Sequence, residues 1–377
     1  MKRVLILCNT ASMILQFNLR NIDILMDLGF EVDVACNFVD GNTCSLELVE
    51  ELKKSFVNRG IGICQIDFKR GYHSFLKWRK ISKQINLILS KKDYSFVHCH
   101  SPAAGIFGRL SAHKFNVPCI VTAHGLMYHR GAPIKNWLLF YPIEKYLSEY
   151  TTLLITINHE DYNFCTRKFK KTEVLYLPGI GIDLERYDSN LLIEKRLETR
   201  KSLGVLEDDI MLLSVGELSK RKNHFSVIKA IKALKNHKIK YYICGIGKLK
   251  NKIIRFVKNN NMENQIFLEG YRSDVANYYN ACDIFVFPSL SEGLPVALME
   301  AIAMKKNVVC SSIRGNVDLV SNSKHLFSPL NCKDIRSKIV YAIENLDESI
   351  NENYTNLLKY DKKKVDQIMH DVYKKYL

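Results

Sequence analysis

The stretch Ser289-Leu-Ser-Glu-Gly-Leu-Pro-Val-Ala-Leu-Met-Glu-Ala301 carries the strongest structural signal in the chain. It follows Asp283-Ile-Phe-Val-Phe-Pro288, an apolar run whose short length and β-branched or aromatic residues predict a buried strand. Good helix formers extend from Val296 to Met304, and Pro295 suits the first helical position because its missing N–H is not needed there. These residues predict a strand, a tight turn and a helix whose N-terminus opens just after Glu292.

Two glutamates accompany this predicted helix start, Glu292 before it and Glu300 within it. Free backbone N–H groups and the positive end of the helix dipole make such a start a natural phosphate site. Glu300 lies about one and a half turns into the helix, at roughly 3.6 residues per turn. Since ionised carboxylates accept hydrogen bonds and sugar hydroxyls donate them, the pattern suits a phosphorylated ligand rich in hydroxyls. The alternative is that both are ordinary acids, placed there because the dipole favours them.

The chain has 377 residues, which is long for one hydrophobic core and favours two domains. Its hydrophobic fraction of 47% and charged fraction of 25% are those of a soluble globular protein. No stretch reaches the roughly 18 to 20 apolar residues that a membrane-spanning helix needs. The apolar run after Met1 is too short for the core of a signal peptide, and we interpret it as a first strand.

The formal net charge of +16 indicates an anionic partner. Nucleic acid, an acidic membrane surface and polyphosphate ligands are all compatible with charge alone. The basic residues are dispersed and no nucleic-acid-reading module is recognisable, so we do not expect nucleic acid as a partner.

The eleven cysteines are scattered singly, without a CxxC pair. Their apolar contexts predict reduced core thiols in the cytosol. His98-Cys99-His100 lacks a second ligand pair at a recognisable spacing, so no metal site is predicted.

Apolar strands alternate with helical patterns in the first half of the chain, the rhythm of a doubly wound parallel sheet. Strands are predicted at Val4–Cys8, Val32–Cys36, Ile63–Ile66, Phe96–His98, Cys119–Thr122 and Leu153–Thr156. Helices are predicted near Asn21–Leu28, Leu46–Asn58, Ser74–Leu89, Ala103–Phe115 and Ile134–Tyr150. Ligands bind outside the carboxyl ends of such strands, so three loops are expected to lie together: Asn9–Phe17, His98–Ala104 and His124–Pro133.

The alternation restarts after a linker at Pro178–Asp183 and a charged helical stretch at Leu184–Arg200. Strands are predicted at Ile210–Val215, Tyr241–Cys244, Ile266–Leu268, Ile284–Phe287 and Asn307–Cys310. Helices are predicted at His224–Leu234, Leu249–Asn259, Val275–Ala281, Val296–Met304, Asp334–Glu344 and Lys362–Leu377.

His124 directly follows a predicted strand and precedes Gly125, which places it at the ligand-binding edge of the first sheet. A lone histidine is more often structural, and that alternative stays open at this stage. Gly125 and Gly131 permit close backbone approach, and His129 and Arg130 suit an anionic acceptor.

The Glu292-x7-Glu300 pattern, with Glu-Gly-Leu-Pro and Met-Glu-Ala inside it, closely resembles the signature of family 4 glycosyltransferases of the GT-B fold. Finer similarities point to a bacterial subgroup that builds exopolysaccharide, capsule or O-antigen repeat units. They lie at residues 11–18, 131–137, 143–145, 155–158, 160–162 and 179–183. One departure is Thr10-Ala11-Ser12, where many members have a glycine pair, so contacts of that loop are not carried over.

The resemblance implies two Rossmann-like domains facing each other across a cleft. Residues 1–183 would form an acceptor-side domain, and residues 184–361 a nucleotide-sugar-binding domain. The helix at 362–377 would cross back to pack on the first domain.

The resemblance also implies a donor site in the second domain. Lys222 aligns with a family lysine that holds the diphosphate, whereas Glu217 stands where an arginine is usual, so Lys220, Arg221 or Arg272 would compensate. In the family, the glutamate that corresponds to Glu300 binds the ribose hydroxyls of the nucleotide. The implied donor-binding residues are Gly216, Lys222, Gly245, Gly247, Tyr271, Arg272, Glu292, Gly293, Leu294 and Glu300.

The implied reaction is retaining transfer of a sugar from a nucleotide diphosphate to an acceptor hydroxyl. His124, Lys222 and Glu292 are the candidate catalytic residues, and Phe17, His129 and Arg130 the candidate acceptor-side residues. A UDP-hexosamine or UDP-hexose is the expected donor and a lipid-linked saccharide the expected acceptor. No Asp-x-Asp motif is evident near the site, so we expect a metal-independent enzyme without a cofactor. Rival interpretations are a UDP-N-acetylhexosamine epimerase and a catalytically silent partner that binds lipid-linked sugar.

The expected location is cytoplasmic, at the inner face of the cell membrane. Basic and aromatic residues from Phe68 to Lys83 suit an anionic lipid interface. An equally open interpretation is a solvated helix whose Phe75 and Trp78 face the core. The apolar helix from Trp137 to Leu147 is interpreted as core.

Overall fold

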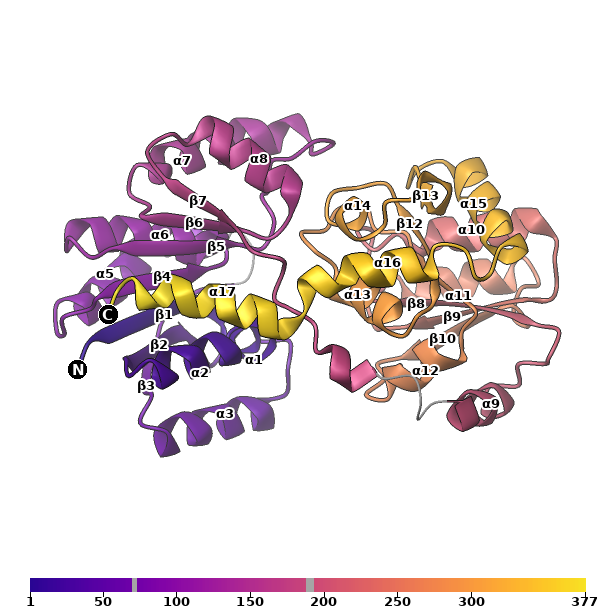
Figure 1. Cartoon of the computed structure of the whole chain (residues 1–377), viewed down its shortest axis with the longest axis horizontal. Helices are drawn as coiled ribbons and strands as arrows, with labels where there is room; N and C mark the ends of the chain where they lie inside the picture. The colour runs from indigo at the N-terminus through magenta and orange to yellow at the C-terminus, as the bar shows by residue number, and fades with distance from the viewer. Residues whose placement is uncertain (70–72, 188–192) are drawn as a thin grey trace. The chain divides into compact units, whose positions relative to one another are not determined.

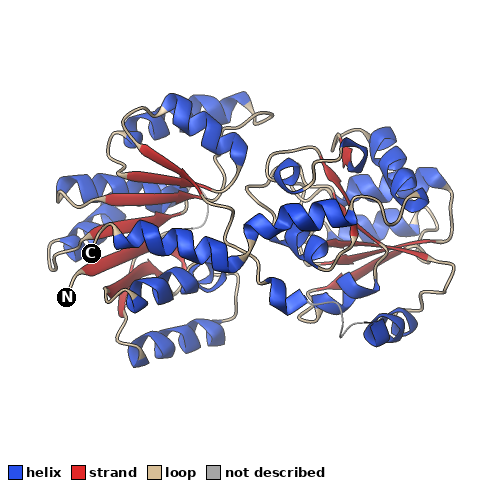
Figure 2. Ribbon diagram, in the orientation of Figure 1, coloured by secondary structure: helices blue, strands red, loops and turns tan. Residues whose placement is uncertain are grey.

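The structure is a computed structural model that describes residues 1–69, 73–187 and 193–377. The chain forms two compact units (Figure 1). Unit 1 consists of Met1–Gly181 together with Lys363–Leu377, and unit 2 of Ile182–Lys362. Each unit is a parallel sheet between helices (Figure 2), which confirms the doubly wound α/β class predicted from the sequence.

The sheet of unit 1 has the strand order β3-β2-β1-β4-β5-β6-β7, and every pairing is parallel. Its strands are β1 (Arg3–Thr10), β2 (Glu31–Asn37), β3 (Gly62–Gln65), β4 (Phe96–His100), β5 (Cys119–Ala123), β6 (Leu153–Thr156) and β7 (Glu173–Tyr176). The order reverses at β1, which pairs with both β2 and β4. Such a reversal opens a crevice at the carboxyl ends of the strands, where the loops after β1, β4 and β5 lie.

Helices cover both faces of this sheet. They are α1 (Ala11–Phe17), α2 (Leu19–Asp27), α3 (Leu46–Asn58), α4 (His73–Leu76), α5 (Trp78–Leu89), α6 (Pro102–Lys114), α7 (Ile134–Ser148), α8 (His159–Lys168) and α17 (Lys362–Lys374). Adjacent strand residues point to opposite faces. Val4 of β1 therefore packs with α1, α2, α3 and α17, and Leu5 packs with α5, α6, α7 and α8. Tyr373 of α17 is fully buried and stacks on Phe96 with 5.7 Å between ring centroids.

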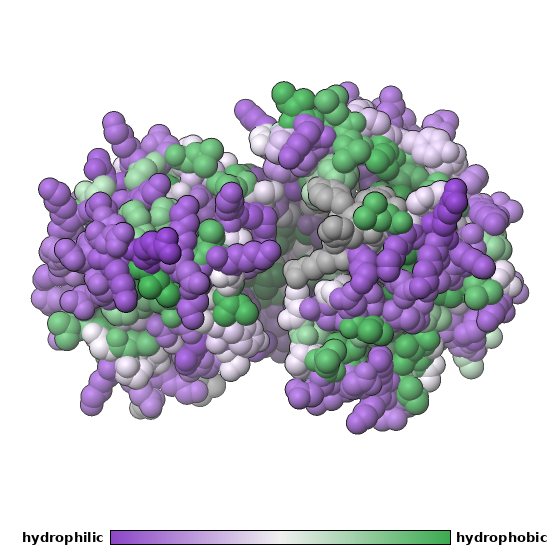
Figure 3. Space-filling model, turned by 180° about the vertical axis from the view of Figure 1, so that it is seen from behind, coloured by the Kyte–Doolittle hydropathy of each residue, from purple (hydrophilic) through white to green (hydrophobic). Residues whose placement is uncertain are grey.

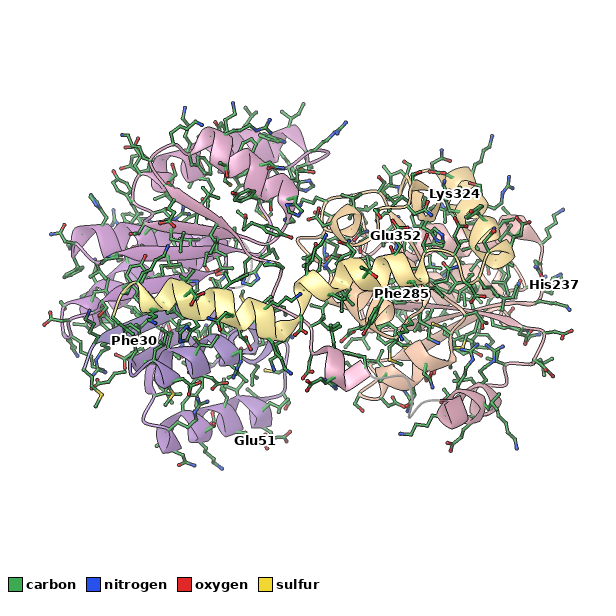
Figure 4. The ribbon with its side chains drawn as sticks, viewed as in Figure 1. Phe30, Glu51, His237, Phe285, Lys324 and Glu352 are labelled. Atoms are coloured by element: carbon green, nitrogen blue, oxygen red, sulfur yellow. The ribbon has the colours of Figure 1, made fainter. Side chains whose placement is uncertain are left out.

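The sheet of unit 2 has the order β10-β9-β8-β11-β12-β13 and is also parallel throughout. Its strands are β8 (Ile210–Val215), β9 (Ile239–Cys244), β10 (Ile266–Gly270), β11 (Ile284–Phe287), β12 (Asn307–Ser311) and β13 (Leu326–Phe327). Its α-helices are α9 (Ile193–Ser202), α10 (His224–Leu234), α11 (Lys250–Lys258), α12 (Val275–Ala281), α13 (Val296–Ala303), α14 (Asn316–Leu319), α15 (Cys332–Glu344) and α16 (Ile350–Leu357). Phe285 lies in the interior of this unit, whereas His237 lies at its surface (Figure 4).

The structure corrects several predicted elements. The predicted loop Asn9–Phe17 contains helix α1, because Ala11 and Ile14 are buried against the sheet and hold this short segment in a helix. The predicted helix at Ser74–Leu89 is divided at Lys77, whose backbone is not helical. Strands β7 and β13 and helices α8, α14 and α16 were not predicted. Part of the predicted helix at Leu184–Arg200 lies outside the described residues.

None of the helices that the structure describes is both long and apolar enough to cross a bilayer. Most of the cysteines are buried and all are free thiols. Burial raises the pKa of Cys244 and Cys282 to about 12, which keeps these thiols protonated and unreactive.

A buried ion pair joins α6 to α7. The side chain of Arg109 is 1% exposed, and its two terminal nitrogens each lie 2.8 Å from one carboxylate oxygen of Glu144. The third guanidinium nitrogen, Nε, donates to the Gly105 carbonyl at 2.7 Å. This bidentate geometry compensates the charge of an arginine side chain that is almost fully buried.

We predict that Glu144→Ala lowers the free energy of unfolding by about 3–5 kcal/mol, because it leaves the Arg109 charge buried without a partner. The double variant Arg109→Leu/Glu144→Leu should lose less, since it leaves no charge behind. Urea unfolding of both variants and the wild type measures the difference. Equal losses for the single and double variants would contradict this account.

Candidate functional site

The start of helix α13 lies one residue later than predicted. The helix begins at Val296, and Pro295 is its N-cap with an extended backbone, so no side chain caps the first turn. Two contacts restrain the loop that precedes α13. Arg314 Nε donates to the Glu292 carbonyl at 2.9 Å, and a Cβ added to Gly315 would lie 2.2 Å from the Gly293 carbonyl oxygen. The free N–H groups of α13 are thus fixed in one orientation.

Glu292 gathers two cations beside this helix start. Its Oε1 accepts hydrogen bonds from Arg221 Nη1 at 2.7 Å and from Lys222 Nζ at 2.8 Å. The Lys222 ammonium also lies 4.7 Å from the centroid of the Phe287 ring. Burial lowers the pKa of Lys222, and the charge of Glu292 acts in the opposite direction. The predicted residues Lys222 and Glu292 are therefore in direct contact.

Glycines bring the strand ends of unit 2 into backbone contact. A Cβ on Gly245 would lie 1.9 Å from the Gly216 carbonyl oxygen, and a Cβ on Gly247 would lie 2.5 Å from the Leu218 carbonyl oxygen. Gly245 N–H donates to the Gly270 carbonyl at 2.6 Å. Only glycine permits this approach at the first two positions. The loops after β8, β9 and β10 consequently meet at one edge, as the predicted donor residues require.

Glu300 faces two tyrosine hydroxyls that the sequence did not reveal. Its Oε1 lies 3.0 Å from Tyr187 Oη and its Oε2 lies 2.9 Å from Tyr279 Oη. Burial, and then the negative charge of Glu300, raises the pKa of both hydroxyls. Tyr187 lies more than a hundred residues before Glu300 in the chain, and no spacing rule connects them.

Arg272 interacts with residues other than Glu292. Its guanidinium makes two 2.8 Å hydrogen bonds with Asp274 and lies 5.1 Å from the Tyr278 ring centroid, while Tyr271 is largely exposed. Of the three cations expected to compensate for Glu217, Arg221 is the one that contacts Glu292.

His124 of unit 1 ends a row of three histidines. Its Nε2 lies 3.3 Å from His100 Nδ1, and its ring lies 5.3 Å from that of Phe17 between centroids. The rings of His100 and His98 are 4.1 Å apart, and His98 bonds Thr122 at 2.8 Å and Tyr373 at 2.9 Å. Burial lowers the pKa of His98 to about 3 and of His124 to about 4, and that of His100 well below its ordinary value. All three are neutral at pH 7.

Helix α8, which was not predicted from the sequence, holds the loop after His124 through hydrogen bonds. Glu160 accepts from the Arg130 N–H at 2.8 Å, and Asp161 accepts from the Leu126 N–H at 3.0 Å. His129 Nδ1 donates to the Arg130 carbonyl at 2.8 Å. The side chain of His129 is thus used within the loop, while Arg130 is exposed to solvent.

A cavity of about 360 Å³ lies in unit 1 beside His124, between α6 and α7. Its walls are mainly apolar, and the Arg109–Glu144 pair is part of its lining. Among the described residues, no three His, Cys, Asp or Glu side chains form a group that could hold a metal ion.

Comparisons with known proteins cover both halves of the chain. "Glycosyltransferase Family 4" matches residues 22–186, and "Glycosyl transferases group 1" matches residues 195–363. The UDP-Gal:alpha-D-GlcNAc-diphosphoundecaprenol alpha-1,3-galactosyltransferase of Escherichia coli is 30% identical over 285 residues, 74% of this chain and 73% of that protein. EpsD of Bacillus subtilis, provisionally named a glycosyltransferase, is 31% identical over 255 residues, 66% of each chain. Among solved structures, Anabaena HepE in complex with UDP superposes with a TM-score of 0.75 at 17% identity over 100% of both chains, which is a likeness of fold.

We predict a stability that falls as the pH is lowered from 6.5 to 4.5. The unfolded chain takes up protons on these histidines near pH 6.5, whereas the folded chain does so only at lower pH. A histidine whose pKa is lowered to about 4 loses roughly 2 kcal/mol of stabilisation between pH 7 and pH 5, and the loss continues until the pH has fallen through the pKa of the folded state. Urea unfolding across this range should show a smaller slope for His100→Gln. The control His237→Gln, at an exposed position, should keep the wild-type slope, and an unchanged slope in His100→Gln would count against a neutral buried His100.

Proposed function

We propose that this chain, which belongs to glycosyltransferase family 4, moves a sugar from a nucleotide-diphosphate donor to a lipid-linked saccharide in the synthesis of a cell-surface polysaccharide. The observation that carries the proposal is the cluster at the start of α13. There Lys222 and Arg221 meet Glu292 beside a helix N-terminus that no side chain caps. Cations and free N–H groups suit a diphosphate, and Glu300 in the same helix suits hydroxyls.

In the proposed reaction, negative charge grows on the leaving diphosphate as the bond to the sugar breaks. Donors that are already in place stabilise this charge without reorganising. Lys222 meets that condition because Glu292 and the Phe287 ring hold its ammonium group. Arg221 supplies a second cation from the same loop. We propose that these groups make the reaction independent of a metal ion.

We assign Glu300 to the ribose of the donor. Each of its oxygens already holds a tyrosine hydroxyl, so the carboxylate is oriented to accept from two hydroxyls at once. The donor we propose is a UDP-hexose or UDP-hexosamine. The UDP-Gal in the name of the Escherichia coli relative and the UDP in the HepE complex support this choice.

We assign His124 to the transferred sugar. The three-histidine row holds its ring, and its neutral state at pH 7 leaves one ring nitrogen able to accept or donate a hydrogen bond. We propose retention of configuration, by a front-face path in which the departing phosphate takes the proton of the acceptor hydroxyl. That path needs no separate general base. Glu292, which is paired with two cations, then acts by holding Lys222 and Arg221 in position.

The acceptor we propose is a saccharide on a polyprenyl diphosphate, as named for the Escherichia coli relative. The apolar cavity beside His124 supports acceptor binding by unit 1. Such an acceptor is membrane-bound, so the enzyme is proposed to work at the cytoplasmic face of the cell membrane.

A thermal-shift titration in EDTA tests the donor site. At a UDP concentration 100 times its Kd, a ligand of the native state stabilises by about 2.7 kcal/mol, which raises Tm by several degrees. We expect UDP or a UDP-sugar to give this shift with the wild type and with Glu344→Ala, an exposed acid of the same unit. Glu300→Ala should lose it. No response to any nucleotide by the folded wild type would overturn the transferase and favour a silent partner. A response that requires divalent metal would overturn metal independence.

The role of Arg221 can be tested by removing its charge and placing an arginine at position 217 instead. Arg221→Ala should weaken UDP binding about tenfold, because it removes one of the two cations on Glu292. Glu217→Arg in that background restores an arginine at the family's usual position and should recover most of the affinity. Calorimetric titration with UDP measures both effects. Unchanged affinity in Arg221→Ala would show that Lys222 alone serves the diphosphate.

A further inference from the structure

Helix α7 is apolar on its outer side as well as its inner side. Trp137, Phe140 and Tyr141 pack against the core of unit 1. Four other large apolar side chains point to solvent: Ile134 (78% exposed), Leu138 (74%), Leu139 (54%) and Tyr146 (59%). At 100° per residue these four fall within one arc of about 140°, which we call the α7 face. The prediction that this helix is core is therefore right for one side and wrong for the other.

The α7 face differs from the outer faces of neighbouring helices. Helix α5 exposes three cations, Arg79, Lys80 and Lys83, so its outer face is more basic than the α7 face. Several large apolar side chains gathered on one side of a surface helix are expected to be covered by a partner. Figure 3 shows hydrophobic side chains gathered at the upper part of unit 1.

The charges around the α7 face favour an anionic partner. Lys135 and Lys145 lie within its arc, and neither has a carboxylate partner in the part of the chain that the structure describes. The acids of the same helix end are already neutralised, Glu144 by Arg109 and Glu149 by Lys171 at 3.2 Å. A second copy docking on this face about a two-fold axis would bring cations toward cations. An anionic lipid surface accepts both the apolar side chains and the lysines.

A second group of exposed apolar and basic side chains lies on the same side of the sheet. Leu76 is 82% exposed and Trp78 is 53% exposed, with the Arg79 guanidinium 5.3 Å from the Trp78 ring centroid. Trp78 therefore does not face the core, and the side chain of Phe75 lies outside the described residues. Helices α5 and α7 both pack on the sheet face formed by Leu5 and Leu7. Tryptophan and basic residues are frequent at membrane interfaces.

We infer that the α7 face is a membrane-docking surface that binds anionic lipid. Helix α7 also contributes Phe140, Ile143 and Glu144 to the cavity beside His124, so the docked helix separates that cavity from the bilayer. This inference rests on the proposed function, because it delivers a lipid-linked acceptor to unit 1, but its test does not depend on sugar transfer.

Flotation of the full chain with vesicles tests the inference. Wild type should float with vesicles of phosphatidylcholine and phosphatidylglycerol and much less with phosphatidylcholine alone. Leu138→Glu/Leu139→Glu should reduce the bound fraction about tenfold, and so should Lys135→Glu/Lys145→Glu. The matched control Leu46→Glu/Val57→Glu changes two exposed apolar residues of α3, on the other face of the sheet, and should bind as the wild type does.

Three results would overturn the inference. The wild type could fail to bind anionic vesicles, or both α7 variants could bind as well as the α3 control. The third result is a dimer, seen by light scattering without lipid, that the α7 variants abolish although they still bind vesicles. That result would make the α7 face a contact between two copies of the chain.

The UDP thermal shift separates this test from the proposed function. A variant that keeps the shift but loses vesicles supports docking, and a wild type that binds vesicles without any nucleotide response leaves docking intact while the proposed transferase fails.

Discussion

Backbone-to-backbone contact between the loops of unit 2 is the constraint on which the candidate donor site depends. Gly216 and Gly245 touch without side chains between them, so the ends of β8 and β9 converge. The Lys222 side chain lies along the open surface of Gly216 and reaches Glu292. A side chain at Gly245 would push the two loops apart, and one at Gly216 would press on the Lys222 side chain that reaches the start of α13. The charged groups are thus effective because uncharged residues place them.

The two units use the same sheet topology for different chemistry. Unit 2 presents cations and an uncapped helix start, which suit phosphate, whereas unit 1 presents neutral histidines and an apolar cavity. Burial disfavours the charged form in both units. In unit 1 it keeps the histidines uncharged, whereas in unit 2 the charge of Glu292 opposes the effect of burial on Lys222. Family 4 membership and the GT-B-like fold are consistent with this separation.

Local patterns predicted most of the fold and part of the site. Long apolar runs such as Ile210–Val215 and Leu153–Thr156 matched their strands because burial on both faces leaves an unbroken signal. Helix α1 was missed because seven residues are too few to show a helical period. The family resemblance named Lys222 and Glu292 as donor-site residues, and the structure places the two side chains in contact. Tyr187, Tyr279 and the His100–His124 contact were not predicted, since they join segments that only the tertiary fold brings together.

The return of α17 to unit 1 has a consequence for how the protein is made. Residues 363–377 belong to unit 1, and Tyr373 fills its core against Phe96 and bonds His98. During synthesis, the core of unit 1 therefore stays incomplete until the whole of unit 2 has been made. Unit 2 is continuous in sequence and can close first. The segment that completes the core of unit 1 is made only after unit 2, so a chain that ended before residue 363 would combine a complete unit 2 with an open, aggregation-prone unit 1.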